Sequence, residues 1–121
     1  MGYRSDVGLC LTGTGKTTLD ARLAALEAGT EKTQNILDLL NCCRDKREDQ
    51  DTGAAAWLWE NLKWYSDYDD VAFIESLLHE LDGEEYYFIR VGESDDDTEI
   101  QGFFWDNPFG MMLMRGIGFD G

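Results

Sequence analysis

Hydrophobic and polar residues repeat at two different periods along this chain, and those periods predict its first elements. Residues 3–11 alternate apolar and polar side chains, which predicts a first strand. Leucines at helical spacing predict a helix over residues 17–27, and apolar residues at the same spacing predict a second helix over residues 30–43. The polar stretch at residues 44–53 has no such period. We therefore expect an exposed loop there.

The second half of the chain continues with a strand, a helix and more strands. Residues 54–65 predict a buried strand with Trp57 and Trp59 on one face, and residues 71–81 have the spacing of an amphipathic helix. Three further strands are expected, at residues 85–92, 99–106 and 110–117. The order β-α-α-β-α-β-β-β predicts an α+β fold, with a largely antiparallel sheet of four to five strands and helices on one face. We expect one domain over residues 1–121.

The stretch LTGTGKTTL, residues 11–19, ends in the way that a nucleotide-binding P-loop ends. A P-loop also needs a glycine five residues before its second glycine, and this chain has Cys10 there. We therefore interpret the stretch as a turn at Gly13 that leads into a helix. Thr17 is expected to cap that helix, with Asp20 as its capping-box partner.

Cysteine and histidine counts limit the chemistry that the chain can carry. The cysteines at positions 10, 42 and 43 are odd in number, and adjacent cysteines cannot easily bridge each other, so no disulfide framework is expected. His79 is the only histidine of the sequence, so it offers no paired zinc ligands and little for a catalytic set. We expect no metal, no cofactor and no catalysis. Because no apolar run approaches the roughly 20 residues of a membrane span, we expect a cytoplasmic protein.

Charge is distributed unevenly. The formal net charge is −15; residues 1–50 carry 8 acidic and 7 basic residues, whereas residues 51–121 carry 17 acidic and 3 basic ones. Such a surface repels nucleic acid, which argues against direct DNA or RNA binding and favours a basic protein partner. The alternative is that the acidity only keeps the protein soluble.

Two acidic clusters are candidates for an interaction surface. One precedes the predicted helix at residues 71–81, and the other lies in a predicted hairpin turn. Their members are Asp67, Asp69, Asp70, Asp95, Asp96, Asp97 and Glu99. The spacing of the second cluster does not match a calcium loop, so we interpret it as a solvated turn and the first as helix capping.

A ligand pocket is the alternative site. Aromatic residues and the few cations nearby in sequence could line it: Arg4, Trp57, Trp59, Lys63, Trp64, Tyr65 and Arg90. Such a pocket would bind a small molecule or a nucleotide. Equally, the cations could form structural ion pairs across the sheet with nearby carboxylates, including Glu60 and Glu99.

Several segments together resemble a group of small uncharacterised phage and prophage proteins. The shared motifs are the opening MGYRSDV, the WENxKWY strand and the FxRxGExxDDxE segment, and they cover the first strand and most of residues 57–100. The resemblance implies a phage context and no specific activity. It favours a host-directed, non-enzymatic role, such as an inhibitor or nucleic-acid mimic that binds a host defence protein.

Overall fold

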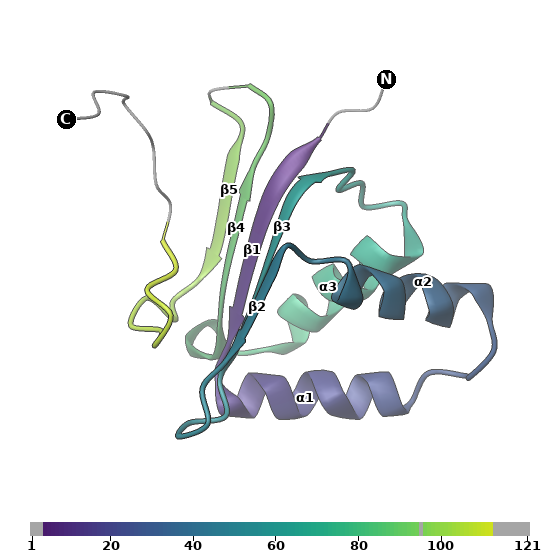
Figure 1. Ribbon diagram of the computed structural model, residues 1–121, viewed down its shortest axis with the longest axis horizontal. Helices are drawn as coiled ribbons and strands as arrows, with labels where there is room; N and C mark the ends of the chain where they lie inside the picture. Colours follow the sequence, from purple (N-terminus) through teal and green to yellow (C-terminus); the bar gives the residue numbers. More distant parts are fainter. Residues whose placement is uncertain (1–3, 95, 113–121) are drawn as a thin grey trace.

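Sheet and helices form two layers in this protein, as the computed structural model of residues 4–94 and 96–112 shows (Figure 1). In that part of the chain the elements are β1 (Ser5–Leu11), α1 (Gly13–Ala24), α2 (Glu31–Asn41), β2 (Asp45–Glu48), β3 (Ala55–Leu62), α3 (Asp69–Glu80), the 3-10 turn η1 (Gly83–Glu85), β4 (Tyr86–Val91) and β5 (Thr98–Gly102). The predicted α+β class is confirmed.

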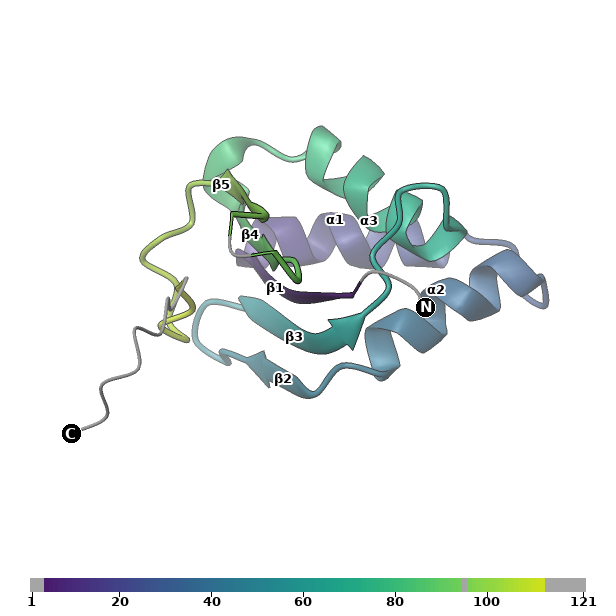
Figure 2. The ribbon, with the colours of Figure 1, turned by 90° about the horizontal axis from the view of Figure 1, so that it is seen from above.

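The described strands form one sheet in the order β2-β3-β1-β4-β5, and every neighbouring pair is antiparallel. β1 therefore lies at the centre, between strands from much later in the chain. Figures 1 and 2 show α1, α2 and α3 together on one side of this sheet. The expectation of helices on one face is confirmed, and the other face is left to shorter segments.

The main core lies between the sheet and these helices. Alternation along β1 directs Val7, Leu9 and Leu11 to the helix side, where all three are fully buried. The helices contribute Ile36 and Leu77, which are also fully buried. The amphipathic helix predicted at residues 71–81 is confirmed as α3, and the side chains predicted for its apolar face pack into this core.

The first helix begins earlier than the sequence predicted. Thr12 is its N-cap, with an extended backbone and a hydroxyl that accepts a hydrogen bond from the Gly15 amide at 3.1 Å. Thr17 lies inside the helix and donates to the Gly13 carbonyl, so the prediction that Thr17 caps the helix is wrong. The chain leaves β1 directly into the helix, so the first available hydroxyl takes the capping position. Asp20 pairs instead with Lys16.

Residues 44–53 are not a loop throughout, because they contain β2. This strand pairs with β3, and its four side chains are charged and mostly exposed. An edge strand with both faces polar has no apolar alternation, which explains why the sequence pattern missed it. At the other end of the chain, β5 ends at Gly102, so residues 103–106 of the strand predicted at 99–106 are not a strand, and neither are residues 110–112. The rest of the strand predicted at residues 110–117 lies outside the described residues.

Candidate interaction surface

The face of the sheet that carries no helix, called here the open face, has a glycine at its centre. The registers of the four strand pairs align one residue from each strand in a row across this face. The row is Asp45, Leu58, Gly8, Ile89 and Ile100. Because Gly8 has no side chain, the row has a gap between Leu58 and Ile89, into which the side chain of Met111 packs.

A segment that follows β5 covers part of the open face (Figure 1, left). Three of its side chains pack on a small second core formed by residues of the three inner strands. This core comprises Cys10, Ala56, Tyr87 and Ile89, and the side chains packed against it include those of Phe104, Phe109 and Met111. The segment does not reach every apolar residue of the face, so the cover is incomplete.

Asn107 holds this segment in a closed turn. Its buried side chain donates to the carbonyls of Phe104 and Met111, each at 3.2 Å, and accepts from the Met111 amide at 2.8 Å. The turn places Met111 over Gly8, where a Cβ would lie 2.9 Å from the Met111 Sδ. The Cys10 thiol also contacts that sulfur, at 3.5 Å. Glycine at position 8 thus allows the close approach of Met111.

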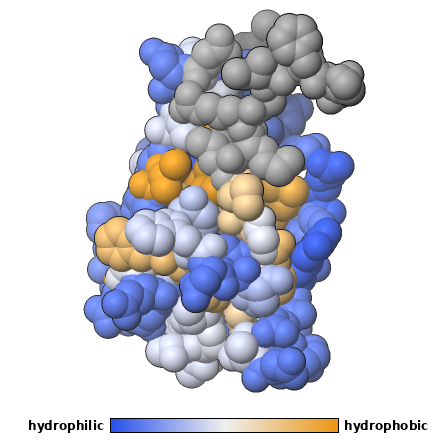
Figure 3. Space-filling model, turned by 90° about the vertical axis from the view of Figure 1, so that its left-hand side faces the viewer, coloured by the Kyte–Doolittle hydropathy of each residue, from blue (hydrophilic) through white to orange (hydrophobic). Residues whose placement is uncertain are grey.

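Large apolar side chains stay exposed around this cover. On the sheet these are Leu58 and Ile100, and on the covering segment they are Phe103, Trp105 and Met112. The rings of Phe103 and Trp105 meet edge to face with centroids 5.6 Å apart. Figure 3 shows this side of the molecule, with apolar residues towards the middle and hydrophilic residues around the edges. Exposed aromatic residues inside a polar rim are typical of protein interfaces.

Two grooves lie on the open face, on either side of Leu58. The smaller, of about 200 Å³, extends over Gly8 between Leu58 and Ile89, with Asp6 also in its lining. The larger, of about 360 Å³, lies over β2 and β3 beside Phe109. Met111 and Met112 line both grooves. The open face therefore offers apolar hollows and not a flat surface.

The acidic cluster of the β4–β5 turn is partly engaged in ion pairs. Arg90 on β4 binds Asp97 at 2.8 Å and Glu99 at 3.2 Å, and it donates to the hydroxyl of Ser5 at 3.1 Å. The hydrogen bond to Asp97, assisted by the one to Glu99, raises the pKa of Arg90 above its ordinary value, although burial opposes this shift. Asp96 is exposed. Asp95 lies outside the described residues.

The other acidic cluster lies at the start of α3. Asp69 and Asp70 occupy its first turn, Asp67 is exposed just before it, and Asp70 accepts a hydrogen bond from the Val71 amide at 2.8 Å. Carboxylates there favour the helix dipole, as expected. Both β3 and β4 run antiparallel to β1, so the two acidic clusters follow strands that end at the same end of the sheet.

The residues predicted to line a pocket are not brought together around one cavity. Trp57, Trp59 and Trp64 are buried in the main core, where the Trp59 indole donates to the Leu39 carbonyl at 2.8 Å. Period-two spacing on β3 puts Trp57 and Trp59 on the face that the helices cover, which explains this outcome.

The cations of that prediction lie apart from the tryptophans. The Arg4 guanidinium donates to the Asn61 carbonyl at 3.0 Å and is exposed, while Arg90 is held by Asp97 and Glu99. Lys63 is exposed, and the ring of Tyr65 packs against that of Tyr68 with centroids 5.2 Å apart. A structural ion pair across the sheet is thus the arrangement observed for Arg90.

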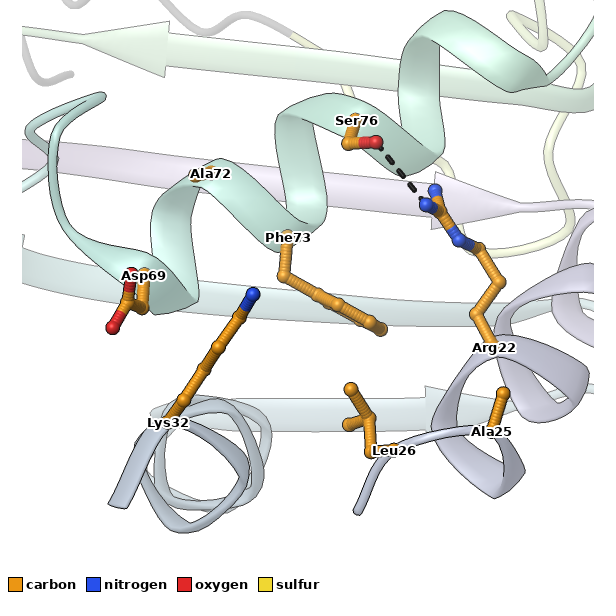
Figure 4. A pocket seen from close by; sticks show the side chains of 8 residues that line it. All are labelled: Arg22, Ala25, Leu26, Lys32, Asp69, Ala72, Phe73 and Ser76. Atoms are coloured by element: carbon orange, nitrogen blue, oxygen red, sulfur yellow. Dashed lines mark hydrogen bonds between the residues drawn. The ribbon is translucent and has the colours of Figure 1, made fainter. Parts of the chain in front are cut away.

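A different pocket with cations and an aromatic ring lies on the helix side (Figure 4). It has a volume of about 350 Å³ and lies between α1, α2 and α3. Arg22 extends over the Phe73 ring, 5.7 Å from its centroid, and donates to the Ser76 hydroxyl at 3.1 Å. Lys32 lies on the opposite side of the pocket, and Leu26 lies beside Ala25 on the side of Arg22 (Figure 4). One feature of the sequence indicated this site, because Arg22 lies beside the apolar stripe of α1.

Nucleophiles and metal ligands do not gather in the part of the chain described here. Burial raises the pKa of the Cys10 thiol to about 12, so this thiol is neutral at ordinary pH. His79 is exposed on α3, away from Cys10. Among the described residues, no group of three or more histidine, cysteine and acidic side chains could hold a metal ion.

The GTGKTT stretch forms the first turns of α1. Its lysine, Lys16, binds Asp20 at 2.7 Å. The carbonyl oxygen of Thr52 lies 2.3 Å from where a Cβ of Gly13 would be, and the carbonyl oxygen of Glu85 lies 2.8 Å from that position at Gly15. Protein carbonyls thus pack closely against both glycines, and carbonyl oxygens repel phosphate.

No protein-family model, curated protein or solved structure matches this chain. In residues 4–94 and 96–112, none of the helices is long and apolar enough to cross a membrane. The geometry of the open face and the charge of the chain therefore carry the functional argument.

Proposed function

We propose that this chain is a small acidic phage or prophage protein that acts without catalysis, by binding a basic protein in the cytoplasm of the host cell. In its stronger form, the chain covers a nucleic-acid-binding groove of a host defence protein and presents carboxylates where phosphates would lie. The exposed aromatic pair Phe103 and Trp105 on a chain of net charge −15 is the observation that carries the proposal.

The charges of the chain favour a basic protein over any other class of partner. In the strongly acidic second half, Arg90 is already bound to Asp97 and Glu99, so its charge is neutralised locally. Asp67 and Asp96 are exposed and have no ion pair among the described residues. Such a surface accelerates association with a cationic partner and disfavours nucleic acid.

Exposed aromatic residues of the segment after β5 supply binding energy that charge alone does not. Phe103 is 59% exposed and Trp105 is 66% exposed. Each could bury a large area against a partner, and aromatic residues dominate the binding energy of many interfaces. Carboxylates then set the association rate and the choice of partner.

Affinity capture tests the proposal. The full chain is immobilised and exposed to a lysate of the host cell, and the retained proteins are identified, purified and titrated individually. We expect a basic protein whose affinity falls about tenfold or more with Trp105→Ala or Phe103→Ala. Retention of no basic protein, or of nucleic acid alone, would contradict the proposal.

Matched charge reversals show whether the two acidic clusters, before α3 and in the β4–β5 turn, act together as a binding surface. Replacing Asp67, Asp69 and Asp96 by lysine should slow association with the basic partner and reduce the dependence of its rate on salt. The control places lysine at Glu27, Glu31 and Asp38, in which Glu31 matches Asp69 as a first-turn helix residue. Equal effects of the two triple variants would leave only net charge as the cause.

A second candidate function is a small-molecule-binding module, and the pocket between the helices favours it. Its lining combines Arg22, Lys32 and the ring of Phe73, which suits an anion with an apolar body (Figure 4). Glu80 lies 3.3 Å from Arg22, and Asp69 also lines the pocket, so carboxylates offset part of this positive charge and we rank this function second.

Phenyl phosphate is a suitable probe for the second function, and Lys32→Gln is the variant to compare. Lys32 is exposed and has no hydrogen bond or ion pair among the described residues, so this substitution leaves the fold intact. Binding by the wild type that Lys32→Gln weakens would favour the module. Equal binding of phenyl phosphate to both proteins would exclude this pocket as its site.

A further inference from the structure

We propose that the groove over Gly8 is the anchor point for the partner, and that it receives one apolar side chain from a segment rich in lysine or arginine. This inference rests on the proposed function, because it names the part of the basic partner that the open face recognises. It concerns one groove, the one of about 200 Å³ between Leu58 and Ile89.

The shape of the groove follows from the strand register. Leu58 and Ile89 are the cross-strand neighbours of Gly8 on its two sides, so they form the walls, and Met111, which packs over Gly8, forms the floor between them. Met112 also lines the groove. A side chain the size of leucine or methionine fits such a hollow, and methionines adapt well to different apolar shapes.

The walls are partly open to water, which makes the groove available. Leu58 is 37% exposed, although it lies in an inner strand between β2 and β1. Ile100, in the same row beyond Ile89, is also exposed. Burying these surfaces against an apolar side chain removes apolar area from water, which favours binding.

The charge of the groove lining selects a cation. Asp6 lines the groove and is exposed, and its carboxylate accepts a hydrogen bond from the Asn61 amide at 3.0 Å. No lysine or arginine of the described residues forms an ion pair with Asp6, whereas Asp45 and Glu60 of the same face are paired with Arg47 and Arg44. A cation next to the inserted side chain would therefore find Asp6 unneutralised.

Peptides of defined composition test the groove without the partner protein. The probe is a blocked five-residue peptide of alternating lysine and leucine. Its counterparts carry serine in place of leucine, or glutamate in place of lysine. Titration of the full ¹⁵N-labelled chain should show saturable shifts of the Asp6, Gly8, Leu58 and Ile89 amides with the first peptide. Binding to each counterpart should be about tenfold weaker or more.

Two variants with one control locate the binding site. Gly8→Ala places a Cβ 2.9 Å from the Met111 Sδ, which pushes this side chain into the groove, and because the Met111 side chain is flexible the strand is expected to stay folded. Leu58→Ser removes a wall. The control is Leu37→Ser on α2, since Leu37 is 38% exposed and so matches Leu58. We expect about tenfold weaker peptide binding for the first two variants and no change for the control.

Any of the following outcomes would overturn the inference. Equal binding of the leucine and serine peptides would mean that charge alone attracts them, and the proposed function would survive without the groove. Equal affinity of a captured basic partner for the wild type and Gly8→Ala would have the same meaning. In the free protein, contacts between Gly8 and residues after Met112 in nuclear Overhauser spectra would assign the groove to this chain's own C-terminal residues. Sedimentation of a dimer whose formation shifts the Gly8 amide would assign it to a second copy.

Discussion

The two faces of the sheet are built from the same strands and differ in what covers them. Along β1, Val7 and Leu9 lie under three helices and are fully buried, whereas Gly8 lies under a single methionine, Met111. The helix face has large, interlocked side chains. The open face has a central glycine, a small core and a cover held by one asparagine.

This difference separates stability from recognition. Truncating a residue of the helix face leaves a cavity that many neighbours enclose, so the cost falls on the whole fold. Another molecule can reach the exposed residues of the open face, such as Leu58 and Ile100. The predictions that follow test this division, in decreasing order of effect on stability.

Leu77→Ala should cause the largest loss. Leu77 is fully buried on the helix face, so we expect the free energy of unfolding to fall by about 2–5 kcal/mol. Urea denaturation measures this value. Leu37→Ala is the control, expected within about 0.5 kcal/mol because Leu37 is exposed. A similarly small loss for Leu77→Ala would refute the assignment of stability to the helix face.

Asn107→Ala should have a smaller effect that is concentrated on the open face. The substitution removes three hydrogen bonds and leaves the Met111 amide without its acceptor, at a cost of about 1–3 kcal/mol. We expect hydrogen exchange at Met111 to accelerate much more than at Leu9. Equal acceleration at both sites would mean that the two faces unfold as one unit.

Cys10 offers a pH test of the open face. Its folded pKa is raised by burial to about 12 from an ordinary value of 9.0. The stabilisation that depends on its neutral form is complete below about pH 9 and is lost as pH rises towards 12, by about 1.4 kcal/mol per unit. Unfolding curves at about pH 8 and about pH 10 should diverge more for the wild type than for Cys10→Ala. Identical pH dependence would contradict the burial of this thiol.

Lys16→Ala should have the smallest effect, because Lys16 belongs to neither face. It forms one ion pair with Asp20 on the surface of α1, which contributes about 0.3–0.5 kcal/mol. Calorimetry with ATP and Mg²⁺ should detect no heat of binding for the wild type. Binding of ATP that this substitution abolishes would restore the nucleotide-binding interpretation of GTGKTT.

The sequence predicted the helix face better than the open face, for a physical reason. Val7, Leu9 and Leu11 alternate along β1, and α3 has a clear apolar stripe, so periodicity was sufficient there. Residues 103–112 have no period. Their position depends on pairings such as Met111 with Gly8, which lie about a hundred residues apart, and on the side chain of Asn107. A glycine in a strand indicates close approach, but it does not name what approaches.

The sequence also predicted only part of the candidate site. Pairing of Arg90 with Glu99 followed from their positions on neighbouring strands, and the structure has this ion pair. The prediction of a buried strand is confirmed for Trp57 and Trp59, and the alternative of an aromatic pocket is wrong, because spacing alone shows which residues share a face and not which face the helices cover. Trp105 and Phe103 were missed altogether. Only the fold reveals that they follow the last described strand and point into solvent.

The composition of β2 determines how the sheet behaves when the protein is concentrated. An edge strand has backbone groups that can pair with a strand of another molecule, and repeated pairing of this kind produces aggregates. β2 is only four residues long, and all four carry a charge. A strand added beside it would have to desolvate Lys46 and Arg47 or lie next to their counterparts in another copy. The charges of β2 thus disfavour the addition of another molecule's strand at this edge of the sheet.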